Sequence, residues 1–225
     1  MSDPRETGWD IPRYESNEVP WGAYYSALGR FMQMFGNVET RLHVVLRDFI
    51  IDLTQTDVNY LAIEIVDTIT GSMRVAGLCD HIKRILRVSN YDEAYQGEFV
   101  YSFNQLGEIH FLRDRIAHHG VSSLSSTEFY TSNEATVRES SQEEILIFTV
   151  DMLLDMAYDL NSLERYFHEL DGAFLRMQGE TPEWDRWVLS QRPTWRYKPS
   201  SLRREGPKHW PIPQKPKRRQ PPSPL

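Results

Sequence analysis

The chain has 225 residues, 40% of them apolar, and a formal net charge of −7; this is enough apolar material to bury one core. Its single cysteine, Cys79, excludes an intramolecular disulfide framework and a cysteine-rich metal site. The polar N-terminus carries no signal-peptide pattern and no run of about 18 uncharged apolar residues occurs, so we expect a cytoplasmic protein with no membrane contact.

Prolines divide the chain. Residues 1–20 contain three prolines among polar neighbours, which predicts an extended N-terminal arm. The next proline is Pro182, and such a long proline-free stretch favours an essentially helical domain, which we place at residues 21–190.

The first predicted helix runs from about Trp21 to Leu53. Its apolar residues recur every three or four positions, as one buried helix face requires, and they are Tyr24, Leu28, Phe31, Phe35, Val38, Leu42, Val45, Phe49 and Leu53. This length and regularity favour the spine of a helical bundle. Glu39 lies at the edge of the same stripe.

Two shorter helices are predicted at 60–70 and 73–88, and a long helix follows, for which Asp92 is a plausible N-cap. The long helix buries a stripe formed by Phe99, Phe103, Leu106, Ile109, Leu112 and Ile116, and Gly120 should end it at about His119. At roughly 100° per residue, Arg113 falls near the middle of this stripe. Its guanidinium is therefore aimed at the core, and Glu39 is its candidate partner.

The region after Gly120 mixes strand and helix signals. Residues 128–130 and 135–137 could form a small hairpin, with 145–148 as a possible third strand. Thr149 is predicted to cap a last long helix, 151–170, and Thr181 with Pro182 to begin a short one. The expected fold class is therefore all-α, a helical bundle with a possible small β-hairpin after the long helix.

The C-terminal residues, 191–225, differ in composition from the rest. From Arg196 to Leu225 there are nine Lys or Arg and one acid, so this part carries +8 and the remainder −15. Nine of the thirteen prolines also lie beyond residue 192. We expect a basic, proline-rich, disordered tail, which serves as a linker or peptide ligand or, alternatively, recruits RNA.

Several signatures of catalysis are absent from the sequence. It contains no glycine-rich phosphate loop, no GxSxG elbow, no HExxH and no calcium-binding loop. Five histidines occur singly and are interpreted as surface or core residues, namely His43, His81, His110, His168 and His209. We expect no metal and no cofactor.

The end of the long helix carries Arg113-Asp114-Arg115-Ile116-Ala117-His118-His119-Gly120. This stretch resembles the motif of HEPN-domain proteins (higher eukaryotes and prokaryotes nucleotide-binding), in which an Arg and a polar residue are followed after three residues by His. Gly36-Asn37-Val38-Glu39 is similar to the Gly-x-x-Glu of the same family. The extra histidine before Gly120 departs from the frequent Ala-His-Gly form and leaves open whether His118 or His119 is the active one.

The resemblance implies metal-independent ribonuclease activity, with two protomers of a homodimer placing their motifs across a shared cleft. The residue types suit such chemistry: an imidazole exchanges protons near neutral pH, and a planar guanidinium can hold a phosphate. Arg113, Asp114 and His118 are the candidate catalytic residues, with Asp114 orienting the imidazole; His119 and Glu39 are possible accessory residues. Attack by the ribose 2′-hydroxyl would leave a 2′,3′-cyclic phosphate without a metal.

Two functions therefore remain open. The leading hypothesis is an endoribonuclease, possibly a toxin or defence component with a cognate antitoxin or other partner protein. The alternative is a non-catalytic module of the same fold that binds a nucleotide or a partner protein. In that case Arg113 pairs with Glu39 inside the bundle, and the histidines stabilise the end of the helix as cations.

Overall fold

The computed structural model describes residues 21–53, 60–88, 93–134, 136, 143–176 and 190–206. These residues form a mostly helical fold with a small antiparallel sheet. Its α-helices are the long α1 (Trp21–Leu53), α4 (Glu93–His119) and α5 (Val150–Arg176) and the shorter α2 (Tyr60–Thr70) and α3 (Val75–Val88). None of the described helices combines the length and apolarity needed to cross a membrane.

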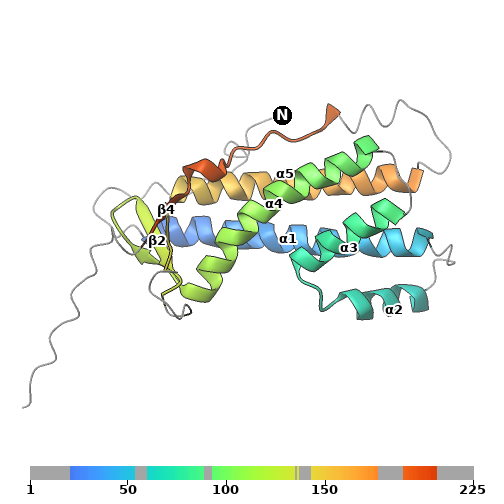
Figure 1. The fold of residues 1–225 in the computed structure, drawn as a ribbon, viewed down its shortest axis with the longest axis horizontal. Helices are drawn as coiled ribbons and strands as arrows, with labels where there is room; N and C mark the ends of the chain where they lie inside the picture. Colours follow the sequence, from blue (N-terminus) through green and yellow to red (C-terminus); the bar gives the residue numbers. More distant parts are fainter. Residues whose placement is uncertain are drawn as a thin grey trace, which may run out of the picture.

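Helices α1 and α5 lie side by side and form the spine of the molecule (Figure 1). Helix α4 crosses them diagonally, α3 packs between α1 and α4, and α2 lies at the margin against α1. The sheet sits at the end of the bundle where α4 finishes and α5 begins. This arrangement brings the last turns of α4 next to the sheet.

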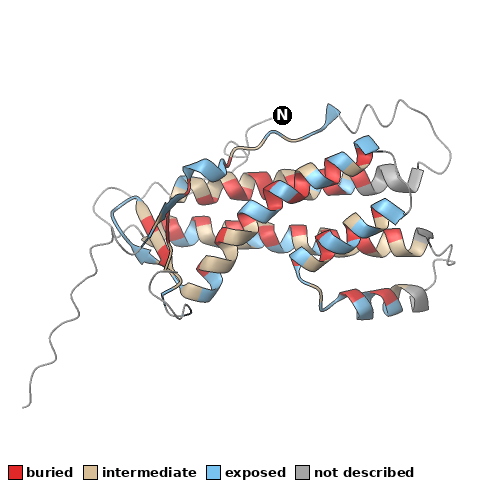
Figure 2. Cartoon of the chain, viewed as in Figure 1, coloured by how far each residue is buried: buried red, intermediate tan, exposed pale blue. Residues whose placement is uncertain are grey.

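One continuous core joins α1, α3, α4 and α5, and the buried residues run as stripes along these helices (Figure 2). The predicted stripe of α4 is buried at every position, and Phe99 in its first half contacts the rings of Phe49, Tyr95, Phe103 and Phe167. Cys79 is buried as well. Periodicity in the sequence therefore identified the faces that form the core.

The ends of the helices also follow their sequence signals. Helices α1 and α2 have the predicted bounds, and α4 ends at His119 because Gly120 adopts the left-handed conformation, with φ of 70°. The hydroxyl of Thr149 accepts a hydrogen bond from the Met152 N–H at 3.2 Å, which confirms the predicted cap of α5.

The sheet contains β1 (Ser122–Ser123), β2 (Glu128–Ser132), β3 (Ile145–Thr149) and β4 (Arg203–Glu205), hydrogen-bonded in that order and antiparallel. The strands at 128–130 and 145–148 are thus confirmed, but they pair directly with each other. The predicted partner strand at 135–137 is not part of the described sheet: Thr136 lies in a turn, and residues 135 and 137 are outside the described residues.

The segment Ser190–Gly206, which we call the C-terminal strap, runs along the bundle to the sheet, where it contributes β4 (Figure 1). Its Tyr197 is 1% exposed, and Leu202 is buried too. The prediction of a disordered tail from residue 191 is therefore wrong for 191–206, because these residues gain a core contact and a strand partner. The predicted arm at 1–20, the short helix beginning at Thr181 and the tail beyond Gly206 lie outside the described residues.

Candidate functional site

The candidate motif occupies the last two turns of α4, at the end of the bundle that carries the sheet. Arg113 and Asp114 are half-buried, whereas His118 is exposed. The negative end of the helix dipole lies here as well, and it favours positively charged groups nearby.

Arg113 lies against α1. Its guanidinium is positioned over the ring of Phe35, 5.1 Å from the centroid, and its Nη1 donates a hydrogen bond to Asp114 Oδ1 at 2.9 Å. The Nε of Arg113 is buried and has no hydrogen-bond partner. The guanidinium is thus aimed at the bundle, as predicted, but it is held by an aromatic face and by its neighbour in sequence.

Glu39 does not hold Arg113. The described part of the chain contains no ion pair or hydrogen bond between the two, and Glu39 is half-buried one turn beyond Phe35. The helical wheel placed Arg113 correctly on the side of α4 that faces α1. In the structure, the Arg113 guanidinium instead contacts the ring of Phe35 and the carboxylate of Asp114.

Asp114 joins two residues of its own helix. Its Oδ1 accepts the bond from Arg113, and its Oδ2 lies 3.3 Å from Nε2 of His110, one turn earlier. The His110 ring stacks on Phe35, with the centroids 5.8 Å apart. Asp114 was expected to orient His118; instead it bridges Arg113 and His110. The interpretation of His110 as an isolated histidine is therefore wrong; its i,i+4 spacing to Asp114 is the signal in the sequence that indicates this contact.

The two histidines at the end of α4 differ in their surroundings. His118 is exposed and makes no hydrogen bond or ion pair with another described residue. His119 is half-buried, and its Nδ1 is buried without a hydrogen-bond partner. Burial lowers the pKa of His119, and the nearby positive groups Arg115 and His118 lower it further. A neutral imidazole at this position can accept a proton.

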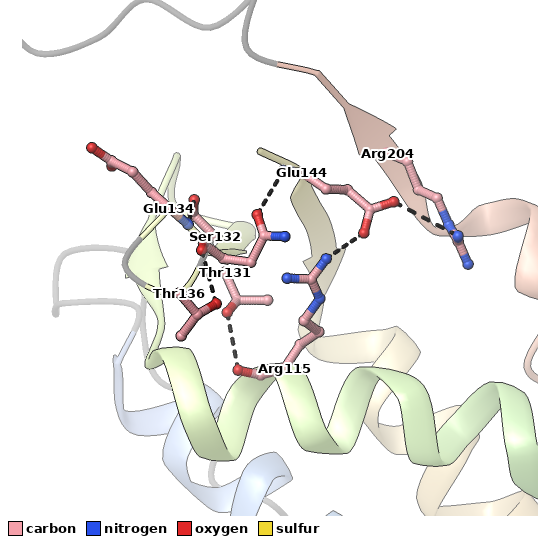
Figure 3. A network of polar contacts seen from close by, with 8 residues as sticks. Arg115, Thr131, Ser132, Glu134, Thr136, Glu144 and Arg204 are labelled. Carbon is pink, nitrogen blue, oxygen red and sulfur yellow. Dashed lines mark hydrogen bonds and ion pairs between the residues drawn. The ribbon is translucent and has the colours of Figure 1, made fainter. Parts of the chain in front are cut away.

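Arg115 faces the sheet and anchors the end of α4 there (Figure 3). Its guanidinium bonds the Glu144 carboxylate just before β3, and Arg204 of β4 lies 3.7 Å from the same carboxylate. Both guanidinium groups also lie over the ring of Phe111, at 5.6 Å for Arg115 and 4.8 Å for Arg204. Within the motif, Arg115 thus has an architectural role that the sequence did not reveal.

Hydrogen bonds from β2 and the turn after it complete this attachment (Figure 3). Thr131 donates its hydroxyl to the backbone carbonyl of Arg115 at 3.2 Å, and the Glu144 N–H donates to the side-chain carbonyl of Asn133 at 2.7 Å. The last turns of α4 are therefore held by the sheet through Arg115 and by α1 through Arg113.

We find no protein family whose model matches this chain, and no similar curated protein or solved structure. The site must accordingly be interpreted from its own chemistry. It offers a partly exposed guanidinium, a half-buried imidazole of lowered pKa and an exposed second imidazole, all within the last two turns of one helix.

Proposed function

We propose that this chain is a metal-independent endoribonuclease of HEPN type. The observation that carries the proposal is that Arg113 is not neutralised inside the bundle by Glu39, while two histidines follow it at the open end of the helix. A guanidinium has five N–H donors, and Asp114 engages only one of its nitrogens, so donors remain for a phosphate oxygen.

In the proposed reaction, the phosphorus of the RNA would be transferred from the 5′-oxygen of one nucleotide to the 2′-oxygen of the preceding ribose. One imidazole removes the proton of the ribose 2′-hydroxyl, and the 2′-oxygen attacks the phosphorus. The 5′-oxygen leaves with a proton from the other imidazole, which gives a 2′,3′-cyclic phosphate and a 5′-hydroxyl. Arg113 would stabilise the negative charge that develops on the phosphate.

The roles of the two histidines follow from their exposure. His119, whose pKa is lowered, suits the removal of a proton at neutral pH, and the exposed His118 can reach an RNA substrate. A second copy of the chain, bound as a homodimer, would cover the exposed end of α4 and supply the opposite wall of a cleft. A toxin or defence role, with an antitoxin or other partner protein, is part of the same proposal.

One observation favours the alternative, a non-catalytic module that binds a nucleotide or a protein. Both carboxylate oxygens of Asp114 are engaged, by Arg113 and His110, so Asp114 does not orient His118. A site built only to bind an anion needs Arg113 but no oriented histidine.

The test is incubation of the full chain with mixed RNA in EDTA, with analysis of the product ends. Arg113→Ala, His118→Ala and His119→Ala are compared with His168→Ala. The last replaces an exposed histidine in the second half of α5, roughly 27 Å along the helix from the sheet end.

We expect cyclic-phosphate ends from the wild type and from His168→Ala, and a loss of about 10²-fold or more when a proton-transferring histidine is removed. RNA that stays intact with a dimeric wild-type protein would reject the nuclease. RNA binding that depends on Arg113 alone would then support the alternative.

A further inference from the structure

A second stripe of residues on α4 is buried or half-buried against the C-terminal strap, the sheet and α5. It consists of Glu98, Tyr101, Gln105, Phe111 and Arg115. The strap therefore covers one side of the helix that carries the motif.

The first part of the strap is held by aromatic contacts. The Arg192 guanidinium lies over the ring of Tyr101, 3.6 Å from its centroid, and 3.2 Å from Glu98. The ring of Trp195 stacks on the ring of Tyr101, with centroids 5.1 Å apart, and the Tyr101 hydroxyl donates to the Pro193 carbonyl at 3.1 Å. These contacts are partly exposed.

The centre of the strap is held by a buried carboxylate. Asp159 of α5 is 0% exposed and accepts hydrogen bonds from the backbone N–H groups of Arg196, at 2.8 Å, and Tyr197, at 3.0 Å. Gln105 of α4 donates to Asp159 at 2.8 Å and to the Tyr197 carbonyl at 3.2 Å. Two of the three donors to this buried charge thus come from the strap, so Asp159 is fully satisfied only while the strap is docked.

The charged and titratable groups around Asp159 act on its pKa in both directions. Burial raises its pKa to about 6, the three hydrogen bonds act in the opposite direction, and Asp155 on the same helix adds a further increase. The Arg196 guanidinium lies over the ring of Tyr158, 3.4 Å from its centroid. From α4, Tyr101 faces the same region. Asp159 thus attaches the strap to α5 through hydrogen bonds that exist only while the strap is docked.

The last part of the strap reaches the motif. Arg204 shares Glu144 and the ring of Phe111 with Arg115, in the last turns of α4. Arg203, its neighbour on β4, instead contacts Glu128 at 3.1 Å. The two arginines are equally exposed, at 52% and 51%, and differ in the side of the strand on which they make contact.

We propose that the C-terminal strap is a latch that opens as one unit, with Asp159 as its lock, and that its opening loosens the end of α4 by withdrawing Arg204 from Glu144 and Phe111. The strap has only two buried residues, Tyr197 and Leu202, and after Ser190 its regular structure is one 3-10 turn and the three residues of β4, as expected for a unit that opens before the bundle unfolds. Opening of the strap would regulate the activity of the motif in the proposed nuclease. Only this consequence rests on the proposed function.

Native-state hydrogen exchange of the full chain, read by mass spectrometry, tests the latch without any RNA. Asp159→Ala removes the lock, and Asp80→Ala, an exposed acid on α3, is its control. We expect the amides of 190–206 to exchange about tenfold faster or more in Asp159→Ala, since each lost hydrogen bond is to a charged acceptor. The amides of α1 should keep their protection.

The pair Arg204→Gln and Arg203→Gln tests the connection to the motif. Exchange in residues 113–120 should rise in Arg204→Gln and Asp159→Ala but not in Arg203→Gln. Trp195→Ala, which removes a partly exposed stack, repeats the test if Asp159→Ala does not fold. A strap that exchanges only together with α1 overturns the latch. An open strap with unchanged exchange at 113–120 overturns its link to the motif, and neither result depends on RNA cleavage.

Discussion

The guanidinium of Arg113 bonds the carboxylate of Asp114, the next residue in the chain, at 2.9 Å. The pair is partly exposed, and Arg113 also lies over Phe35. A charge pair between adjacent residues near the surface contributes little to folding, so it does not explain why an arginine occupies the middle of an apolar stripe. The contacts with Asp114 and Phe35 therefore fix the position of the guanidinium but do not account for its presence in the stripe.

Asp114→Asn should therefore change the free energy of unfolding by less than about 1 kcal/mol, because the ion pairs with Arg113 and His110 are screened by solvent. Urea denaturation of the variant and the wild type measures the difference. A loss of several kcal/mol would instead identify Asp114 as a structural anchor and weaken the nuclease proposal.

Gly120→Ala should destabilise the protein by about 1 kcal/mol, because a Cβ is strained at a φ of 70° even where there is space around it. Gly107→Ala, in the middle of α4 with nothing near the new Cβ, should stabilise it by roughly 0.5–1 kcal/mol. Urea denaturation should give changes in the free energy of unfolding of opposite sign for the two variants. Equal changes would show that Gly120 does not end the helix in this way.

Phe99→Ala should cost about 3–5 kcal/mol, because Phe99 is fully buried among aromatic rings and its removal leaves a cavity in the core. Val100→Ala, on the exposed side of the same turn, should stay within about 0.5 kcal/mol. Comparison of the two midpoints in urea checks the orientation of α4, since a similar cost at both positions would mean that the helix is rotated.

The contribution of Asp159 to stability should depend on pH. Its pKa of about 6 in the folded protein lies above its ordinary value of 3.8, so the folded state takes up a proton that the unfolded chain does not. This contribution is complete below the ordinary value and is lost as the pH rises through about 6.

The comparison with Asp159→Asn isolates this contribution from that of the other acids. Relative to the variant, the wild type should gain stability as the pH is lowered from about 7 to about 4.5. Urea denaturation at several pH values measures the difference, and a gain in the opposite direction would mean that the hydrogen bonds keep Asp159 charged.

Cys79 should be nearly inert in the folded protein. Burial raises the pKa of its thiol to about 12, whereas an unfolded thiol has a pKa of roughly 8.5, so the folded chain presents very little thiolate. Alkylation by iodoacetamide near pH 8 should be at least about a hundredfold slower without urea than in urea. Rapid alkylation of the folded chain would show that α3 opens readily.

The sequence predicted the helices best where burial repeats along one face. The stripes of α1 and α4, the glycine at 120 and the cap at Thr149 are local signals, and each specifies its own element. Wheel geometry also placed Arg113 toward α1. It could not choose the partner of Arg113, because the choice between Glu39, Phe35 and Asp114 depends on distances that only packing fixes.

The strap escaped prediction for a different reason. Its prolines and basic residues have the composition of a disordered tail, and no apolar period is present. It docks because a buried carboxylate recognises its main chain, and backbone N–H groups leave no trace in a sequence. The sequence likewise gives no sign that Glu144 forms ion pairs with both Arg115 and Arg204.

The second stripe on α4 has a practical consequence for anyone who expresses part of this chain. A fragment that stops near residue 190, where composition places the domain boundary, would lack Trp195, which covers Tyr101. It would also leave Asp159 with a single hydrogen-bond donor, Gln105. Such a fragment should aggregate or lose solubility, since it exposes aromatic surface and an undersatisfied charge together. A recombinant form of the folded unit should extend through Gly206.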